Sequence, residues 1–377
     1  MRLLMRRAAS RNGTAALLLA LLLYSLSPAE TGRAGSPSAG TGYVQAVALA
    51  RHGREAESAA LLRPLVSTND PVISKSVRLL LMQDERALFH YQAALSALGP
   101  LLADPEPQLA NRVRLLRALA DVPSEMVRRH TPIYLSSPLI AGTIGARQIR
   151  FLVDTGASFS VLSRSTAKEA GLHVRPVQYE IKTALGQRIA ADVTTGDLAV
   201  AGAIIRNVVF LILPDGAIPP GLPYSGVIGL PALRVLGPFN ISGLASGRKQ
   251  NRAPLILVDG SLGLEINLRD TRMQCALDTG SNRSWFASPA GANIPGLSNG
   301  REVRTIESAA GSDRKIRARE TSLEFSIAGR HALLHRALIM APPQLDGSSP
   351  VCVLGADAVA ALAPLTLDFD RMQIVLR

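Results

Sequence analysis

Residues 151–158 read FLVDTGAS, and a similar stretch, CALDTGSN, recurs far downstream at residues 275–282. Each stretch is followed by an apolar pair and a glycine, VIGL at 227–230 and VLGA at 353–356, at nearly the same distance. One tripeptide can recur by chance, but a repeated motif with a repeated partner at matched spacing indicates an internal duplication. We therefore predict two similar halves that join near residues 242–252.

The repeated motif places an aspartate in a sharp turn directly after an apolar strand. A single aspartate of this kind is explained by an Asx turn, in which the side chain satisfies its own backbone. Two of them, in pseudosymmetric copies, can meet between the halves. Since two carboxylates at close range cannot both ionise cheaply, one keeps a proton and the other can activate a water. The sequence thus predicts a water-activating pair, Asp154 and Asp278, that needs neither a metal nor a cofactor.

Residues 131–377 resemble the pepsin and retropepsin superfamily of aspartic peptidases, and are most similar to bacterial single-chain proteins with two retropepsin-like lobes. The resemblance implies a bilobal acid-protease fold with Asp154 and Asp278 as the catalytic aspartates. It implies that the hydroxyls of Thr155 and Thr279 cross-brace the two active loops. It also implies that supporting positions in these loops and beneath them are held by Gly156, Ala157, Gly280, Ser281, Gly229 and Gly355.

The resemblance further implies a β-hairpin flap over the cleft. The candidates are residues 183–187, with Thr183, Leu185 and Gly186, and residues 308–312, with Ala310 and Gly311. Both segments lie between an aspartate and its apolar-glycine partner, and both have a glycine at the expected tip.

The two active loops differ at one position, where Ala157 stands opposite Ser281. A hydroxyl at this position can donate to the neighbouring carboxylate and favour its charged form. Our hypothesis is that Asp278 is the ionised member of the pair and Asp154 the acid, and that Ser281 is the cause.

The N-terminal part of the chain differs in amino-acid composition from the rest. Residues 1–29 combine an arginine-rich start, the apolar run AALLLALLLYSL at 15–26, and small residues at 27–29, the pattern of a secretory signal peptide. An uncleaved membrane anchor is the alternative. We expect an exported protein, either periplasmic or secreted. Residues 30–42, rich in glycine, serine, threonine and alanine, are expected to form a flexible linker.

Residues 43–122 show apolar residues at three- and four-residue intervals, which predicts a small all-α module of helical hairpins. It would serve as a partner-binding or propeptide-like module, or as a plain spacer. From residue 123 short β-branched runs alternate with turn residues, which predicts a mainly β fold with lobe 1 at 123–250 and lobe 2 at 251–377.

Two further features bear on function. Cys275 and Cys352, the two cysteines, precede Asp278 and Gly355 by three positions each, and both a buried disulfide and two free thiols fit this placement. The net charge of +12 comes from scattered arginines without interleaved aromatics, so we expect a solvated basic surface and no nucleic-acid partner.

Together these features predict an exported aspartic endopeptidase that cleaves extended peptides or unfolded proteins. Because one chain supplies both aspartates, a monomer suffices. Two alternatives remain: a peptide- or partner-binding module that does not cut, and a scaffold whose role lies in the helices. We interpret Asp357, Asp368 and Asp370 as surface or turn carboxylates, since they lack the Asp-Thr-Gly turn.

Overall fold

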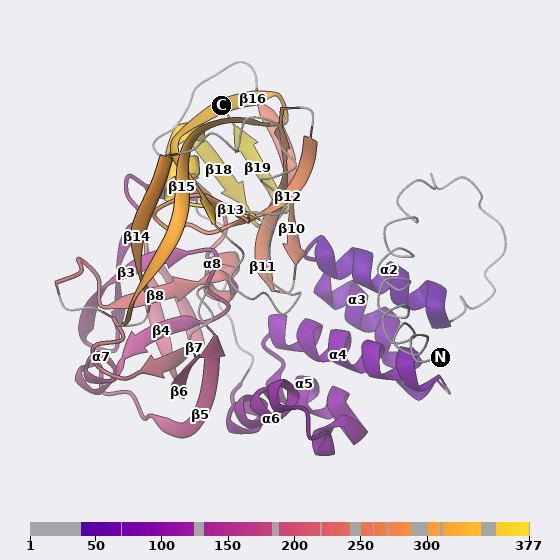
Figure 1. Cartoon of the computed structure of the whole chain (residues 1–377). Helices are drawn as coiled ribbons and strands as arrows, with labels where there is room; N and C mark the ends of the chain where they lie inside the picture. The colour runs from indigo at the N-terminus through magenta and orange to yellow at the C-terminus, as the bar shows by residue number, and fades with distance from the viewer. Residues whose placement is uncertain are drawn as a thin grey trace, which may run out of the picture. The chain divides into compact units, whose positions relative to one another are not determined.

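The computed structural model describes residues 39–68, 70–123, 132–182, 188–218, 221–241, 250–258, 260–269, 271–287, 301–309, 312–340 and 352–376. From residue 39 the described chain is helical up to residue 119, and it is mainly β from residue 133, as the sequence predicts (Figure 1). Residues 39–42 of the predicted linker belong to the first helix. The proposed signal peptide at 1–29 lies outside the described residues.

The helical region contains five α-helices, joined by short turns. They are α2 (Ala39–Arg51), α3 (Glu55–Leu62), α4 (Pro71–Ala87), α5 (Tyr91–Leu98) and α6 (Pro107–Leu119). The start of α4 is set by Asp70, whose carboxylate accepts from the amides of Val72 and Ile73 at 2.8 and 3.0 Å. Proline at the first helical position fits there because its missing N–H would have no partner within the helix.

Lobe 1 is built around a seven-stranded sheet with the order β2-β3-β8-β4-β7-β6-β5. Its strands are β2 (Leu139–Ile144), β3 (Arg147–Asp154), β4 (Ser160–Ser163), β5 (Arg175–Lys182), β6 (Arg188–Val200), β7 (Ala203–Leu213) and β8 (Gly226–Gly229). Two short helices, α7 (Arg164–Glu169) and α8 (Leu230–Leu236), follow β4 and β8. Strand β3 runs parallel to β8 and places Asp154 opposite Gly229.

Lobe 2 repeats this arrangement within a larger sheet of twelve strands, ordered β1-β9-β18-β19-β10-β11-β12-β17-β13-β16-β15-β14. These are β1 (Ile133–Leu135), β9 (Phe239–Ile241), β10 (Asn251–Val258), β11 (Ser261–Leu268), β12 (Thr271–Leu277), β13 (Trp285–Ala287), β14 (Arg301–Ala309), β15 (Ser312–Ile327), β16 (Arg330–Met340), β17 (Cys352–Leu354), β18 (Leu365–Asp368) and β19 (Gln373–Leu376), with helix α10 (Ala356–Leu362). Strand β12 runs parallel to β17, as β3 does to β8.

Two strands of the lobe 1 segment belong to the sheet of lobe 2. Strand β1 pairs with β9, and β9 pairs with β18. The chain of lobe 1 therefore contributes to the sheet of lobe 2, while the seven-stranded sheet of lobe 1 stays separate.

A disulfide joins Cys275 and Cys352, so of the two alternatives for these cysteines the bridge is the one found. The two residues lie on the adjacent strands β12 and β17, with their Cα atoms 4.8 Å apart. The bridge therefore links the strand that leads into Asp278 to the strand that leads into Gly355.

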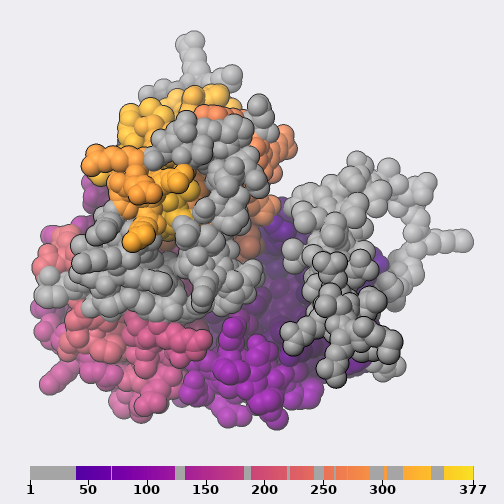
Figure 2. Space-filling view, viewed as in Figure 1, coloured from indigo at the N-terminus to yellow at the C-terminus, as the bar shows by residue number. Residues whose placement is uncertain are grey.

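The helical region shares a hydrophobic core with lobe 1. Leu115 and Leu119 of α6 belong to the same buried cluster as Val193 and Leu211 of the lobe 1 sheet. An ion pair between Glu55 of α3 and Arg234 of α8, with N–O distances of 2.5 and 2.9 Å, adds a largely buried polar contact. In Figure 2 the surface of the helices continues into that of lobe 1.

Candidate active site

Each motif aspartate lies at the end of a buried strand and is held by its own turn. The amides of Gly156 and Ala157 donate to Asp154 Oδ1 at 2.9 and 3.0 Å. The amides of Gly280 and Ser281 donate to Asp278 Oδ1 at 2.9 and 3.1 Å. The Asx-turn interpretation thus holds for both aspartates, and the turn fixes one oxygen of each carboxyl group.

A symmetric set of hydrogen bonds joins the two turns. The Thr155 amide donates to Thr279 Oγ1 and the Thr279 amide to Thr155 Oγ1, both at 3.1 Å. Each hydroxyl then donates across the interface at 2.6 Å, from Thr155 to the Leu277 carbonyl and from Thr279 to the Val153 carbonyl. Both threonines are buried. The structure therefore contains the cross-brace between the loops that the resemblance implies.

The cross-brace brings each carboxyl group against the glycine of the other loop. A Cβ atom on Gly156 would lie 2.5 Å from Asp278 Cγ, and one on Gly280 would overlap the carboxyl group of Asp154. Only glycine leaves this space free. The two carboxyl groups consequently lie beside each other and share a hydrogen bond.

Burial raises the pKa of both carboxyl groups. The pKa of Asp154 lies well above its ordinary value, since the charge and hydrogen bond of Asp278 add to burial while the amides of Gly156 and Ala157 oppose it. For Asp278 the hydrogen bond from Asp154 and the amides of Ser281 and Gly280 oppose the rise. The pair therefore holds one proton and one negative charge, and the amide bonds of the two loops are equivalent.

The assignment of the proton to Asp154 stays a hypothesis, but the reason that we gave for it was wrong. The Ser281 hydroxyl donates to the Arg283 carbonyl at 2.9 Å rather than to a carboxylate. The bond from Ser281 to Asp278 comes from its backbone amide, not from its side chain. The backbone amide of Ala157 makes the same kind of bond to Asp154. The side chain at this position therefore does not distinguish the two aspartates.

A Ser281→Ala variant tests this correction. Because the hydroxyl does not contact Asp278, we expect kcat/KM for peptide cleavage to change by less than about twofold, and the acidic limb of its pH profile to stay in place. The measurement is kcat/KM against pH for both proteins. An acidic limb that moves to higher pH would restore the hydroxyl as the cause.

Two serines that the sequence analysis missed support the loops from below. The Gly229 amide donates to Ser160 Oγ at 3.2 Å, and the Gly355 amide donates to Ser284 Oγ at 3.0 Å. Ser160 and Ser284 each lie six positions after the motif aspartate, so the shared offset was a signal in the sequence. The glycines are also required here, since a Cβ on Gly229 would lie 2.5 Å from backbone atoms of Phe159.

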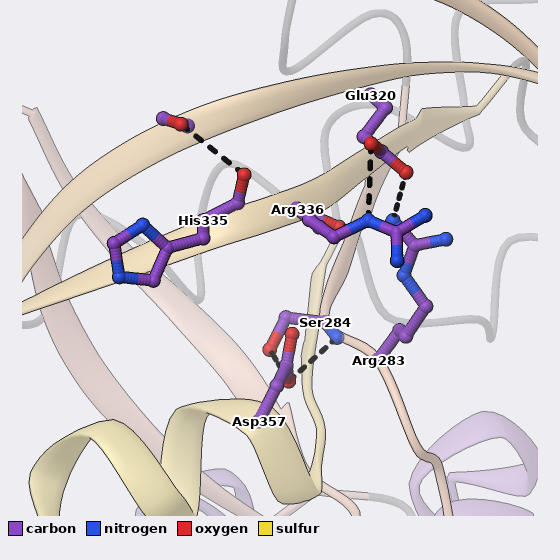
Figure 3. Close-up of polar contacts among 7 residues, drawn as sticks. Arg283, Ser284, Glu320, His335, Arg336 and Asp357 are labelled. Atoms are coloured by element: carbon purple, nitrogen blue, oxygen red, sulfur yellow. Dashed lines mark hydrogen bonds and ion pairs between the residues drawn. The ribbon is translucent and has the colours of Figure 1, made fainter.

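Lobe 2 extends this support with an acidic residue. Asp357 Oδ1 accepts from the Ser284 amide at 2.8 Å and from its hydroxyl at 2.6 Å (Figure 3). Asp357 was expected to be a surface or turn carboxylate, and it instead supports the second active loop. Asp368 is buried rather than on the surface, but it accepts from the Arg371 amide three positions on, as a turn carboxylate does, and also from the Arg371 guanidinium and the Gln373 amide group.

An ionic contact links the second active loop to the long hairpin β14–β15. Arg283, five positions after Asp278, donates to Glu320 of β15 at 2.6 Å (Figure 3). Arg336 of β16 donates to the other oxygen of Glu320 at 3.1 Å. Both cations lower the pKa of Glu320 and keep it charged.

The flap candidates themselves lie outside the described residues, namely Thr183, Leu185, Gly186, Ala310 and Gly311. The strands on either side of them are described. Strands β5 and β6 pair antiparallel as far as Lys182 and Arg188, and β14 and β15 as far as Ala309 and Ser312. Each candidate segment therefore connects the two strands of a hairpin.

Tyr224, which no motif identified, lies two positions before the start of β8. Burial and the charge on Asp154 raise the pKa of its hydroxyl. The tyrosine is therefore within electrostatic reach of the carboxyl pair.

Comparison with known proteins agrees with this geometry. Residues 140–232 match the family described as aspartyl protease, a segment that contains Asp154 and Gly229 and runs from β2 into α8. No curated protein matches the chain.

Three of the similar solved structures show low sequence identity to this chain. An aspartic proteinase from Irpex lacteus is 12% identical over 63% of this chain and 93% of that one, with a TM-score of 0.43. A retropepsin-like aspartic protease from Rickettsia conorii is 15% identical over 34% and 89%, with a TM-score of 0.26. The retroviral protease-like domain of Ddi1 from Leishmania major is 18% identical over 26% and 77%, with a TM-score of 0.19.

The family match lies in lobe 1, and lobe 2 repeats the strand pairing and the turn of lobe 1. The expected resemblance to aspartic peptidases is thereby confirmed for the matched residues, 140–232.

Proposed function

We propose that this protein is an exported aspartic endopeptidase whose Asp154 and Asp278 activate a water against a peptide bond. The observation that carries the proposal is the set of four hydrogen bonds between Thr155 and Thr279 and the facing backbone, which holds two carboxyl groups against each other. Turns that merely satisfied their own backbones would not need to meet.

The proposed reaction uses the two protonation states in turn. The Asp278 carboxylate accepts a proton from water as the water oxygen attacks the carbonyl carbon of the scissile bond. Asp154 gives its proton to the carbonyl oxygen, which would otherwise carry the developing negative charge. When the C–N bond breaks, the proton now on Asp278 goes to the departing nitrogen, and the hydroxyl proton returns to Asp154.

The substrate that suits this arrangement is an extended peptide or an unfolded protein. One hairpin follows each aspartate in the sequence, β5–β6 after Asp154 and β14–β15 after Asp278, and an extended segment can pair with hairpin backbone. One copy of the chain holds both carboxyl groups, so we propose that the monomer is the active species.

Export is proposed from the basic and apolar pattern of residues 1–29. The disulfide between Cys275 and Cys352 supports it, since such bridges persist in oxidising compartments. Within the described ranges, no helix has the length and apolar character needed to cross a membrane.

Asp154→Asn distinguishes a peptidase from a binding module. We expect the variant to bind an unfolded test protein such as reduced, alkylated casein with unchanged affinity, but to lose cleavage by at least about a hundredfold, because the proton donor is gone. Cleavage is followed from acid to neutral pH by the appearance of new amino termini, and affinity by fluorescence anisotropy. Binding by the unmodified chain without any cleavage would identify a binding module instead.

A further inference from the structure

The edge strand of the lobe 1 sheet, β5, is covered by helix α6 (Figure 1). At the start of the strand, the Arg175 guanidinium donates to the Ala118 carbonyl and to the Asp121 carboxylate, both at 2.6 Å. An edge strand exposes unpaired backbone groups that another strand can bind. Here a helix takes the place of that neighbouring strand.

Near the other end of β5, Asn111 of α6 makes two hydrogen bonds to one residue of the strand. Its Nδ2 donates to the Glu180 carbonyl and its Oδ1 accepts from the Glu180 amide, both at 2.8 Å. A carboxamide carries a donor group and an acceptor side by side, as a backbone peptide does. The side chain can therefore make, at a single residue, the two backbone hydrogen bonds that a neighbouring strand would make. Strand β5 ends at Lys182, two residues beyond Glu180. The flap candidate begins at the next residue.

The helix that holds Asn111 is itself well anchored. Leu115, Leu116 and Leu119 of α6 are almost completely buried in the core shared with lobe 1. Tyr179 and Ile181 of β5 pack against the same core. The amide bonds of Asn111 therefore connect the strand to a rigid support.

A second connection runs from the helices to the first active loop and on to the same strand. The guanidinium of Arg86 in α4 lies 5.2 Å from the ring centroid of Phe159, five positions after Asp154. The Phe159 ring meets the Tyr179 ring of β5 edge to face, with centroids 6.1 Å apart. Strand β5 is thus held between the helices and the active loop.

We propose that Asn111 is a positioning residue for substrate binding: through its two bonds to Glu180, helix α6 fixes strand β5 near the loop end of the hairpin β5–β6, and so orders the strand with which substrate would pair. This inference rests on the peptidase function proposed above. With this role, the helical region is a part of the peptidase rather than a spacer or a partner-binding module. Ordering the hairpin before substrate arrives lowers the entropic cost of binding.

The test compares Asn111→Ala and Asn111→Asp with the unmodified chain. The aspartate keeps the shape of asparagine, but when ionised it cannot donate to the Glu180 carbonyl. We expect both variants to raise KM for an extended peptide about three- to tenfold with kcat within about twofold, because the hairpin serves bound substrate and transition state alike. The Glu180 amide should also exchange its hydrogen faster, which mass spectrometry with fragmentation resolves.

Gln108→Ala is the matched control, since Gln108 is an exposed amide residue of the same helix. It should change neither KM nor exchange. Faster exchange at Glu180 with an unchanged KM would mean that Asn111 only covers a sheet edge, and would overturn the inference while the peptidase function stands. Absence of cleavage by the unmodified chain would instead refute the proposed function, and this inference with it.

Discussion

Replacing Asp278 with asparagine is expected to lower kcat/KM for cleavage of an unfolded protein by at least about a thousandfold. Asp278 is the carboxylate of the pair in the proposed reaction, and an amide cannot accept the proton of the attacking water. The turn survives, because asparagine Oδ1 can accept the same bonds from Gly280 and Ser281. The loss should therefore appear as lost turnover in a folded protein, which we would measure as kcat/KM together with circular dichroism.

The unmodified pair also predicts how activity depends on pH. Activity requires one proton on the pair, so it should fall as pH drops and Asp278 becomes protonated. It should fall again as pH rises through the raised pKa of Asp154. Both limbs of the profile should lie above the ordinary carboxyl pKa of about 4, because burial raises both pKa values, and the Asp278→Asn variant should show no such profile.

The stability of the folded chain should decrease as pH rises and the pair Asp154 and Asp278 loses its proton. Because burial raises both pKa values, the folded chain holds protons more tightly than the unfolded chain does. The stabilisation from this pair is fully present below the unfolded pKa of about 4 and is lost as pH rises through the raised pKa of Asp154. Thermal unfolding at several pH values should show this loss in the unmodified chain and less of it in Asp278→Asn.

Asp215→Asn is the control for a general effect of removing a carboxylate. Asp215 is exposed in lobe 1 and accepts from the Ser165 amide. It should leave kcat/KM unchanged. Full activity in Asp278→Asn would contradict the proposed mechanism whatever the control shows.

Replacing Thr155 with valine is expected to lower the free energy of unfolding by about 2–4 kcal/mol. Its hydroxyl donates to the Leu277 carbonyl and accepts from the Thr279 amide, and valine can do neither. Both partners would be left without that bond in a buried place, where an unsatisfied polar group is costly. Urea unfolding measures the loss, and Thr279→Val should show a similar one because its bonds are equivalent.

Activity should fall with stability in these variants, since the same bonds bring the carboxyl groups together. Thr155→Ser is the matched control, because serine keeps the hydroxyl and loses one methyl group. It should retain most of both properties. Equal losses in the serine and valine variants would show that the methyl contact, rather than the hydrogen bonds between the loops, carries the effect.

The amino-acid sequence by itself determined the two active loops and their relation. A strand that ends in Asp-Thr-Gly has a local geometry that its own residues impose, and a duplicated motif implies a duplicated place in the fold. The pairs Asp154 with Gly229 and Asp278 with Gly355 could be predicted for this reason. The offset of Ser160 and Ser284 was equally visible, but serine at that position has no meaning until the glycine amide that it serves is known.

Only the tertiary structure decided what lies around these loops. The inclusion of β1 and β9 in the sheet of lobe 2, the disulfide between Cys275 and Cys352, and the bonds from Asn111 to Glu180 all join residues far apart in the chain. The direction of the Ser281 hydroxyl depended likewise on where the Arg283 carbonyl came to lie. A local pattern states which groups a residue offers, whereas packing of distant segments decides which partner each group meets.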